Sequence, residues 1–95
     1  MAQGYWIVRV SVRDAARYPD YLAAARPAFE KFGARFVVRG GPFEAKEGVS
    51  RERNVVVEFA DVATAQACYD SPEYQAAKAI RNAVADADFI IVEGA

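Results

Sequence analysis

Apolar and polar residues alternate with a period of two in four separate segments of the chain. These segments cover residues 5–12, 34–39, 53–60 and 88–93, and they are rich in valine, isoleucine and aromatic residues. Successive side chains of a strand face opposite sides of a sheet, so this period is typical of a strand with one buried face. The pattern therefore predicts four β-strands.

Between these segments the spacing of apolar residues changes to steps of three and four, which is the period of a helix. The first such segment predicts a helix that starts near Tyr18 and ends before Gly33, a residue suited to a helix C-terminus. Asp61 is a good N-cap for a second helix. Ser71, followed by a proline and an acid, is a strong start for a third helix that runs to about Val84.

The segment after the second strand is harder to interpret. Gly40-Gly41-Pro42 is expected to break or bulge the strand, and residues 43–52 are expected to continue it in bent form up to a turn at Gly48. The order β-α-β-β-α-β predicts the ferredoxin-like α+β fold as a single domain over residues 1–95. Two right-handed crossovers give the antiparallel strand order 4-1-3-2, with the helices on one face.

The two faces of this predicted sheet differ in composition. One face is almost wholly apolar and is expected to lie under the helices; it carries Trp6, Val8, Val10, Val12, Phe36, Val38, Val55, Val57, Phe59, Phe89 and Ile91. The other face, called the open face below, mixes charged and apolar residues. It carries Tyr5, Ile7, Arg9, Ser11, Arg35, Val37, Arg39, Asn54, Val56, Glu58, Asp88, Ile90 and Val92. Its five branched residues would each contribute roughly 1.5–3 kcal/mol if buried, which predicts a homodimer joined through the open face.

Composition narrows the range of functions. The chain has 95 residues, 12 Lys and Arg against 13 Asp and Glu, no histidine and one cysteine. Near-neutral charge argues against nucleic acid, and the predicted third strand presents Asn54, Val56 and Glu58 where RNA-binding modules of this topology present aromatic residues. Without histidine, zinc sites, haem ligation and Ser/His or Cys/His catalysis are not expected, so no metal and no cofactor is predicted. No segment has the features of a signal peptide or a membrane span, so a cytoplasmic protein is expected.

Two charged residues on adjacent central strands are the first candidates for chemistry. Arg9 and Glu58 share the open face, and two interpretations remain. They could form a structural ion pair within a dimer interface. Alternatively, Arg9 could bind an anionic substrate while Glu58 acts as a general base.

Four further residues are candidate ligand contacts. Arg39 precedes the predicted bulge, which could aim its side chain at the mouth of a cavity, although an exposed arginine is equally consistent with the pattern. Tyr5 could form part of an aromatic wall. Ser71 is explained as an N-cap, and Tyr74 fits the apolar face of its helix with a hydroxyl that needs a partner; the helix start they share could also hold an anion.

The chain resembles the domain-of-unknown-function family 1330, which lies within the dimeric α+β barrel superfamily. The resemblance covers nearly the whole chain, and its most specific part is Tyr69-Asp70-Ser71-Pro72-Glu73-Tyr74-Gln75. It also includes Gly4-Tyr5-Trp6, Asp14, Tyr18, Tyr21, Val38-Arg39-Gly40-Gly41, Glu44, Gly48, Val57-Glu58-Phe59, Arg81 and Ile91-Val92-Glu93-Gly94. It implies a dimeric barrel and a bacterial protein, but no reaction.

Two classes of function follow from these observations. In the first, the protein binds a small, partly apolar and anionic organic molecule in a dimeric-barrel cavity, with or without cofactor-free chemistry of the monooxygenase or isomerase type. In the second, it is a non-catalytic interaction or ligand-sensing module whose charged sheet face only specifies dimerisation. Whether the protein is an enzyme stays undecided at this stage.

Overall fold

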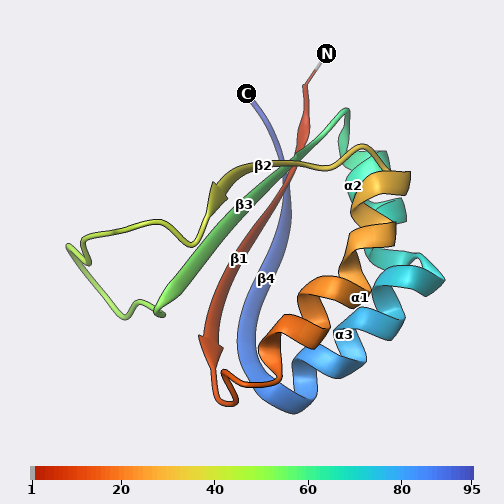
Figure 1. Cartoon of the computed structure of the whole chain (residues 1–95). Coiled ribbons are helices and arrows are strands. Elements are labelled where there is room, and N and C mark those ends of the chain that lie inside the picture. Colours follow the sequence, from red (N-terminus) through yellow and green to blue (C-terminus); the bar gives the residue numbers. More distant parts are fainter. Residues whose placement is uncertain (1) are drawn as a thin grey trace.

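A computed structural model describes residues 2–95. It contains seven elements in the order β-α-β-β-α-α-β (Figure 1). They are β1 (Gly4–Val12), α1 (Tyr18–Lys31), β2 (Arg35–Arg39), β3 (Arg53–Phe59), α2 (Val62–Asp70), α3 (Pro72–Val84) and β4 (Ala85–Glu93).

The four strands form one antiparallel sheet in the order β2-β3-β1-β4, as the element order predicts. All three helices lie on the same side of the sheet (Figure 1). The core lies between the two layers, where Trp6, Val57 and Phe59 are each 1% exposed. The expected ferredoxin-like α+β architecture is therefore confirmed.

Local hydrogen bonds explain where the later helices begin. The Asp61 carboxylate accepts a hydrogen bond from the Thr64 N–H at 2.7 Å, and the Ser71 hydroxyl accepts one from the Tyr74 N–H at 3.2 Å. Both are the N-cap contacts predicted for α2 and α3, because they occupy N–H groups that have no partner inside the helix. Gly33, which follows the C-cap residue Phe32 of α1, adopts the left-handed conformation expected there, with φ 65°.

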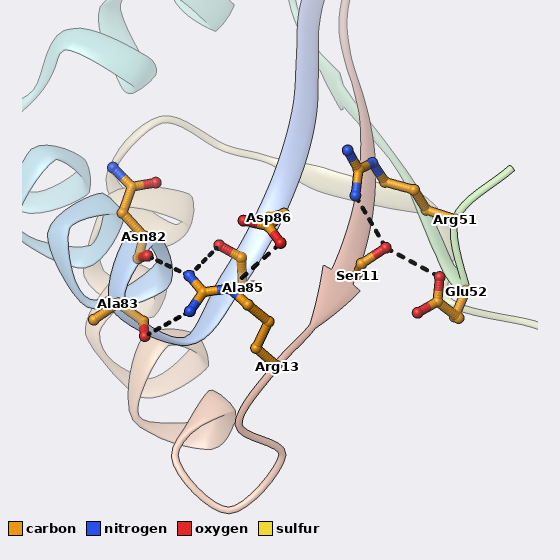
Figure 2. Close-up of polar contacts among 8 residues, drawn as sticks. All are labelled: Ser11, Arg13, Arg51, Glu52, Asn82, Ala83, Ala85 and Asp86. Carbon is orange, nitrogen blue, oxygen red and sulfur yellow. Dashed lines mark hydrogen bonds and ion pairs between the residues drawn. The ribbon is translucent and has the colours of Figure 1, made fainter. Parts of the chain in front are cut away.

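The C-terminus of α3 contacts Arg13, the residue that follows β1. Arg13 donates to the carbonyl of Asn82 at 2.7 Å and to that of Ala85 at 3.2 Å, and it pairs with Asp86 at 3.4 Å (Figure 2). A cation at this position satisfies terminal carbonyls and complements the negative end of the helix dipole. This contact joins the end of α3 to the first residues of β4. β4 begins at Ala85, which pairs with Val12, rather than near Asp88.

β2 ends at Arg39, as the break expected at Gly40-Gly41-Pro42 predicts, but the expected bent continuation of the strand over residues 43–52 is wrong. Residues 41–52 contain no strand; they form an irregular loop that bends at Gly48 (φ 75°) and extends away from the helices (Figure 1). In addition, β2 has a bulge before its end: Phe36 pairs with Val57 and Val38 pairs with Val56, so Val37 is an extra residue.

The bulge exchanges the faces of the residues that follow it, because one inserted residue shifts the alternation by one position. Val38 lies opposite Val56 on the open face and is 41% exposed, so its predicted place under the helices is wrong. Arg39 lies opposite the buried Val55 and stacks on the Phe36 ring at 3.9 Å. Its predicted place on the open face is therefore also wrong: it belongs to the helix side of the sheet.

Candidate functional site

A cleft opens on the helix side of the sheet, between α1 and the edge strand β2 with its neighbour β3. α1 packs mainly against α3, which leaves space between α1 and this half of the sheet. The outer cleft has a volume of about 540 Å³, and an inner recess of about 30 Å³ lies deeper, over β1. The two spaces share four lining residues: Leu22, Phe29, Phe36 and Arg53.

The inner recess is almost entirely apolar, with Trp6, Val8, Tyr18 and Tyr21 among its walls. Its volume is enough for one water-sized group. An apolar floor with a few placed polar groups is typical of small-molecule sites. The recess would therefore accommodate a single oxygen or methyl substituent of a ligand whose body lies in the outer cleft.

The mouth of the cleft carries an excess of positive charge. Arg26, Arg39 and Arg53 line it, against the single carboxylate of Glu30. Within residues 2–95, no acidic group lies within 4 Å of Arg39 or Arg53, so both guanidinium groups lack an ionic partner. This charge arrangement favours an anion at the mouth of the cleft.

Arg53 is held at the mouth by its surroundings. Its guanidinium carbon lies 5.6 Å from the centroid of the Tyr18 ring, and its Nε atom is buried without a hydrogen-bond partner. A Cβ at Gly40 would come within 2.5 Å of the Arg53 Nη1 atom, and Gly40 has φ 64°. Gly40 therefore supplies both the left-handed turn after β2 and the space that Arg53 occupies.

A buried polar chain lies behind the recess. Arg81 Nη1 donates to the Tyr74 hydroxyl at 2.8 Å, and the Tyr74 hydroxyl lies 2.8 Å from the Tyr21 hydroxyl. Arg81, Tyr74 and Tyr21 are only 5%, 0% and 7% exposed. Burial raises the pKa of both tyrosines, so both hydroxyls stay protonated at neutral pH.

The open face holds a separate polar cluster. The Glu58 carboxylate accepts hydrogen bonds from the Tyr5 hydroxyl at 3.0 Å and from Arg35 at 3.2 Å. The hydrogen bond to Glu58 raises the pKa of Tyr5. Arg9 is not part of this cluster: it lies opposite Asn54, four positions or about 13 Å along β1 from the partner of Glu58. Arg9 and Glu58 therefore do not form an ion pair within one chain, which was one of the two interpretations of these residues.

Arg9 and its neighbours instead hold the end of the β2–β3 loop against the sheet. Arg9 donates to the carbonyl of Val49, and the Ser11 hydroxyl lies 3.0 Å from both Arg51 and Glu52 (Figure 2). Arg51 also pairs with Asp88 at 2.8 Å. These contacts give the charged half of the open face a structural role.

Ser71 is fully engaged within the protein. Besides capping α3, its hydroxyl donates to the carbonyl of Cys68 at 2.7 Å, and the residue is 6% exposed. Cys68 is buried, and burial raises the pKa of its thiol to about 12. Neither group is available as a nucleophile at neutral pH. No group of three or more Cys, Asp or Glu side chains within residues 2–95 could hold a metal ion.

The six residues predicted as a site thus lie in three places. Tyr5, Arg9 and Glu58 are on the open face, Arg39 is at the mouth of the cleft, and Ser71 and Tyr74 are in the helical layer.

Sequence reasoning missed three site residues: Arg53, Tyr21 and Arg81. Arg81 carried a usable signal, since it lies seven positions after Tyr74 on the buried face of α3, where a charged residue is unusual. Tyr21 was named only as part of the family resemblance, and Arg53 carried no signal, because the role of both depends on the space between α1 and the sheet.

The fold and its helical layer define a ferredoxin-like protein with one helix-covered sheet face, and comparison with known proteins places it in a family. The family model described as "Domain of unknown function (DUF1330)" matches residues 3–95, so the chain belongs to this family. The search of curated proteins found no match.

Solved structures with the same fold come from several bacteria. RPA0582, a protein of unknown function from Rhodopseudomonas palustris, is 21% identical, with a TM-score of 0.78 over 96% of this chain and 81% of that one. SnoaB, a cofactor-independent oxygenase from Streptomyces nogalater, is 14% identical, with a TM-score of 0.66 over 97% and 92%. A dimeric ferredoxin-like protein of unknown function from Bacteroides fragilis is 14% identical, with a TM-score of 0.57 over 96% and 95%. At these identities the likeness is one of fold.

No helix within residues 2–95 combines the length and the apolar character needed to cross a bilayer.

Proposed function

We propose that the protein binds a small aromatic or partly apolar organic anion in the cleft between α1 and strands β2 and β3. The observation that carries this proposal is the combination of an apolar recess with two arginines, Arg39 and Arg53, that have no acidic partner at its mouth. A ligand with an apolar ring and one negative charge satisfies both features. It buries its ring against Phe29 and Phe36 and pairs its charge with a guanidinium group.

The proposal is tested with a panel of aromatic anions: benzoate, 1-naphthoate and 4-nitrophenolate. Each is titrated into the protein by calorimetry beside an uncharged analogue, for instance 4-nitroanisole against 4-nitrophenolate. Arg53→Gln is expected to weaken anion binding about tenfold or more and to leave binding of the uncharged analogue nearly unchanged, because it removes one charge-assisted contact.

Arg17→Gln is the matched control, since Arg17 is an exposed arginine that precedes α1 and does not line the cleft. It is expected to bind the panel as the wild-type protein does. Absence of saturable binding for all three anions, or equal losses in both variants, would contradict the proposal and favour the non-catalytic interaction module.

Cofactor-free chemistry is the catalytic form of this proposal. SnoaB is a cofactor-independent oxygenase of the same fold. A site that stabilises a phenolate or enolate prepares an electron-rich ligand for reaction with dioxygen, the co-reactant that such chemistry requires. A catalytic role for Glu58 and Arg9 stays a prediction. Both residues lie on the open face, on the other side of the sheet from the cleft. Oxygen consumption with a bound phenolate, compared between wild-type protein and Arg53→Gln, tests the cleft as the catalytic site.

Exposed apolar residues on the open face favour a second copy of the chain as the partner there. Val38, Ile90 and Val92 are 41%, 55% and 39% exposed there, and the similar protein from Bacteroides fragilis is described as dimeric. Ile90→Asp is expected to convert a dimer of about 21 kDa into the 10.4 kDa monomer in native mass spectrometry. Ala76→Asp, at an exposed position of α3 on the other side of the sheet, is the control. A monomeric wild-type protein would contradict the dimer.

A further inference from the structure

Arg81 is a buried cation without a carboxylate partner. It is 5% exposed, and no acidic side chain of residues 2–95 lies within 4 Å of its guanidinium group. Its contacts are the Tyr74 hydroxyl at 2.8 Å, the Asn82 side-chain oxygen at 3.5 Å, and the Tyr21 and Phe89 rings at 5.9 and 5.6 Å. Buried charges are normally paired because removal from water is costly.

The chemistry of Arg81 sets the direction of the hydrogen-bond chain. Arginine has only donors, so the Tyr74 oxygen accepts from Arg81. Tyr74 is 0% exposed, and the Tyr21 oxygen at 2.8 Å is the acceptor available to its own proton. Either direction leaves one hydroxyl proton without an acceptor in the protein. On Tyr74 that proton would be fully buried, which is the costlier arrangement, whereas Tyr21 is 7% exposed and lines the recess, where a ligand can accept from it. The chain therefore runs from Arg81 through Tyr74 to Tyr21.

This direction leaves one donor at the end of the chain. In this arrangement the Tyr21 O–H proton has no acceptor among residues 2–95, although Tyr21 is only 7% exposed. Tyr21 is also a wall of the inner recess, so the unassigned donor belongs to the residue that lines the deep end of the cleft. Each bond in the chain polarises the next, so the charge of Arg81 strengthens the Tyr21 hydroxyl as a donor.

We propose that Tyr21 is the oxyanion donor of the cleft: its O–H group, polarised through Tyr74 by Arg81, binds the anionic oxygen of a ligand whose ring lies in the outer cleft. This inference rests on the proposed function and assigns the ligand class more narrowly. Arg53 lines the recess as well as the outer cleft, so the anionic oxygen that pairs with Arg53 is the one that Tyr21 binds. The recess has room for one oxygen-sized group, which fits a phenolate or enolate oxygen better than a carboxylate or a phosphate.

The test uses 4-nitrophenol, whose neutral and ionised forms differ in absorbance, so the pKa of the bound probe can be measured by pH titration. Tyr21→Phe removes the donor and keeps the ring. It is expected to weaken binding of the phenolate about tenfold or more with little effect on the neutral phenol, and so to raise the pKa of the bound probe by about 1. A residue with a packing role only would weaken both forms equally.

Tyr69→Phe is the matched control, because Tyr69 packs on Tyr74 at 5.7 Å but does not line the recess. It is expected to leave the pKa of the bound probe unchanged. Tyr74→Phe keeps the Tyr21 hydroxyl and separates it from Arg81, so the bound probe should again have a raised pKa. If Tyr21→Phe does not fold, the pKa of the probe bound to Tyr74→Phe tests whether Tyr21 is the oxyanion donor.

The possible failures are distinguishable. If the phenolate binds and depends on Arg53, yet both Tyr21→Phe and Tyr74→Phe leave the pKa of the bound probe unchanged, the oxyanion donor is refuted while the proposed function stands. If the wild-type protein binds none of the three anions, the proposed function fails and this inference fails with it.

Discussion

Replacing Ser71 by alanine separates its structural role from a role in ligand binding. The Ser71 hydroxyl accepts from the Tyr74 N–H at 3.2 Å and donates to the Cys68 carbonyl at 2.7 Å. Both partners are buried, so Ser71→Ala leaves an N–H group without its cap and a carbonyl with one bond fewer. The Ser71 N–H also donates to that carbonyl at 3.2 Å, which limits the second loss.

The expected loss in the free energy of unfolding follows from these two contacts. Loss of an N-cap costs about 1 kcal/mol, and loss of a second net hydrogen bond costs about 1 kcal/mol more. A total of about 2 kcal/mol corresponds to a fall in Tm of roughly 8–16 °C for a domain of this size. Ser71→Thr keeps the hydroxyl and should recover most of the stability.

Thermal unfolding followed by circular dichroism measures this change, and calorimetry with 4-nitrophenolate well below the lower Tm measures binding. Ser50→Ala, at an exposed loop position, is the control and should leave Tm unchanged. The reasoning is refuted if Ser71→Ala unfolds at the wild-type temperature, or if it loses binding while it remains folded.

Three other predictions follow from the structure. In the monomeric Ile90→Asp background, Val38→Thr should change the free energy of unfolding by less than about 0.5 kcal/mol in denaturant titrations, since the bulge puts Val38 on the open face; a larger loss would indicate that Val38 lies in the core. The native Cys68 thiol, with its pKa raised to about 12, should react with a disulfide reagent at pH 8 far more slowly than in denaturant, and fast native labelling would contradict its burial. Hydrogen bonds lower the pKa of Asp61, Glu73 and Asp88, so their stabilisation is present above the ordinary values of 3.8 and 4.5 and is lost as the pH falls through the lower folded values. Denaturant midpoints at pH 7, 5 and 3 test this, and an unchanged midpoint at pH 3 would contradict it.

The element order, the sheet and the helix starts were predictable because their signals are local. Period-two alternation puts Trp6, Val8 and Val10 on one face of their strand whatever the rest of the chain does. The caps at Asp61 and Ser71 use neighbours three residues away. These features require no knowledge of distant contacts. The predicted strand order follows from connection rules that hold for nearly all folds of this kind.

The site was less predictable because it depends on one inserted residue and on tertiary spacing. The bulge at Val37 moves Arg39 to the helix side, and no residue type at that position distinguishes a bulge from a continuous strand. The pairing of Tyr21 with Tyr74 joins residues 53 positions apart, and it depends on α1 packing beside α3.

The most direct test of the central claim is to map where an aromatic anion binds. The measurement is a titration of ¹⁵N-labelled protein with 4-nitrophenolate, followed by amide chemical shifts. The structure predicts saturating shifts at Leu22, Phe36 and Arg53, which line the cleft. Shifts confined to the open face around Arg9 and Ile90, or no saturating shifts at all, would contradict it.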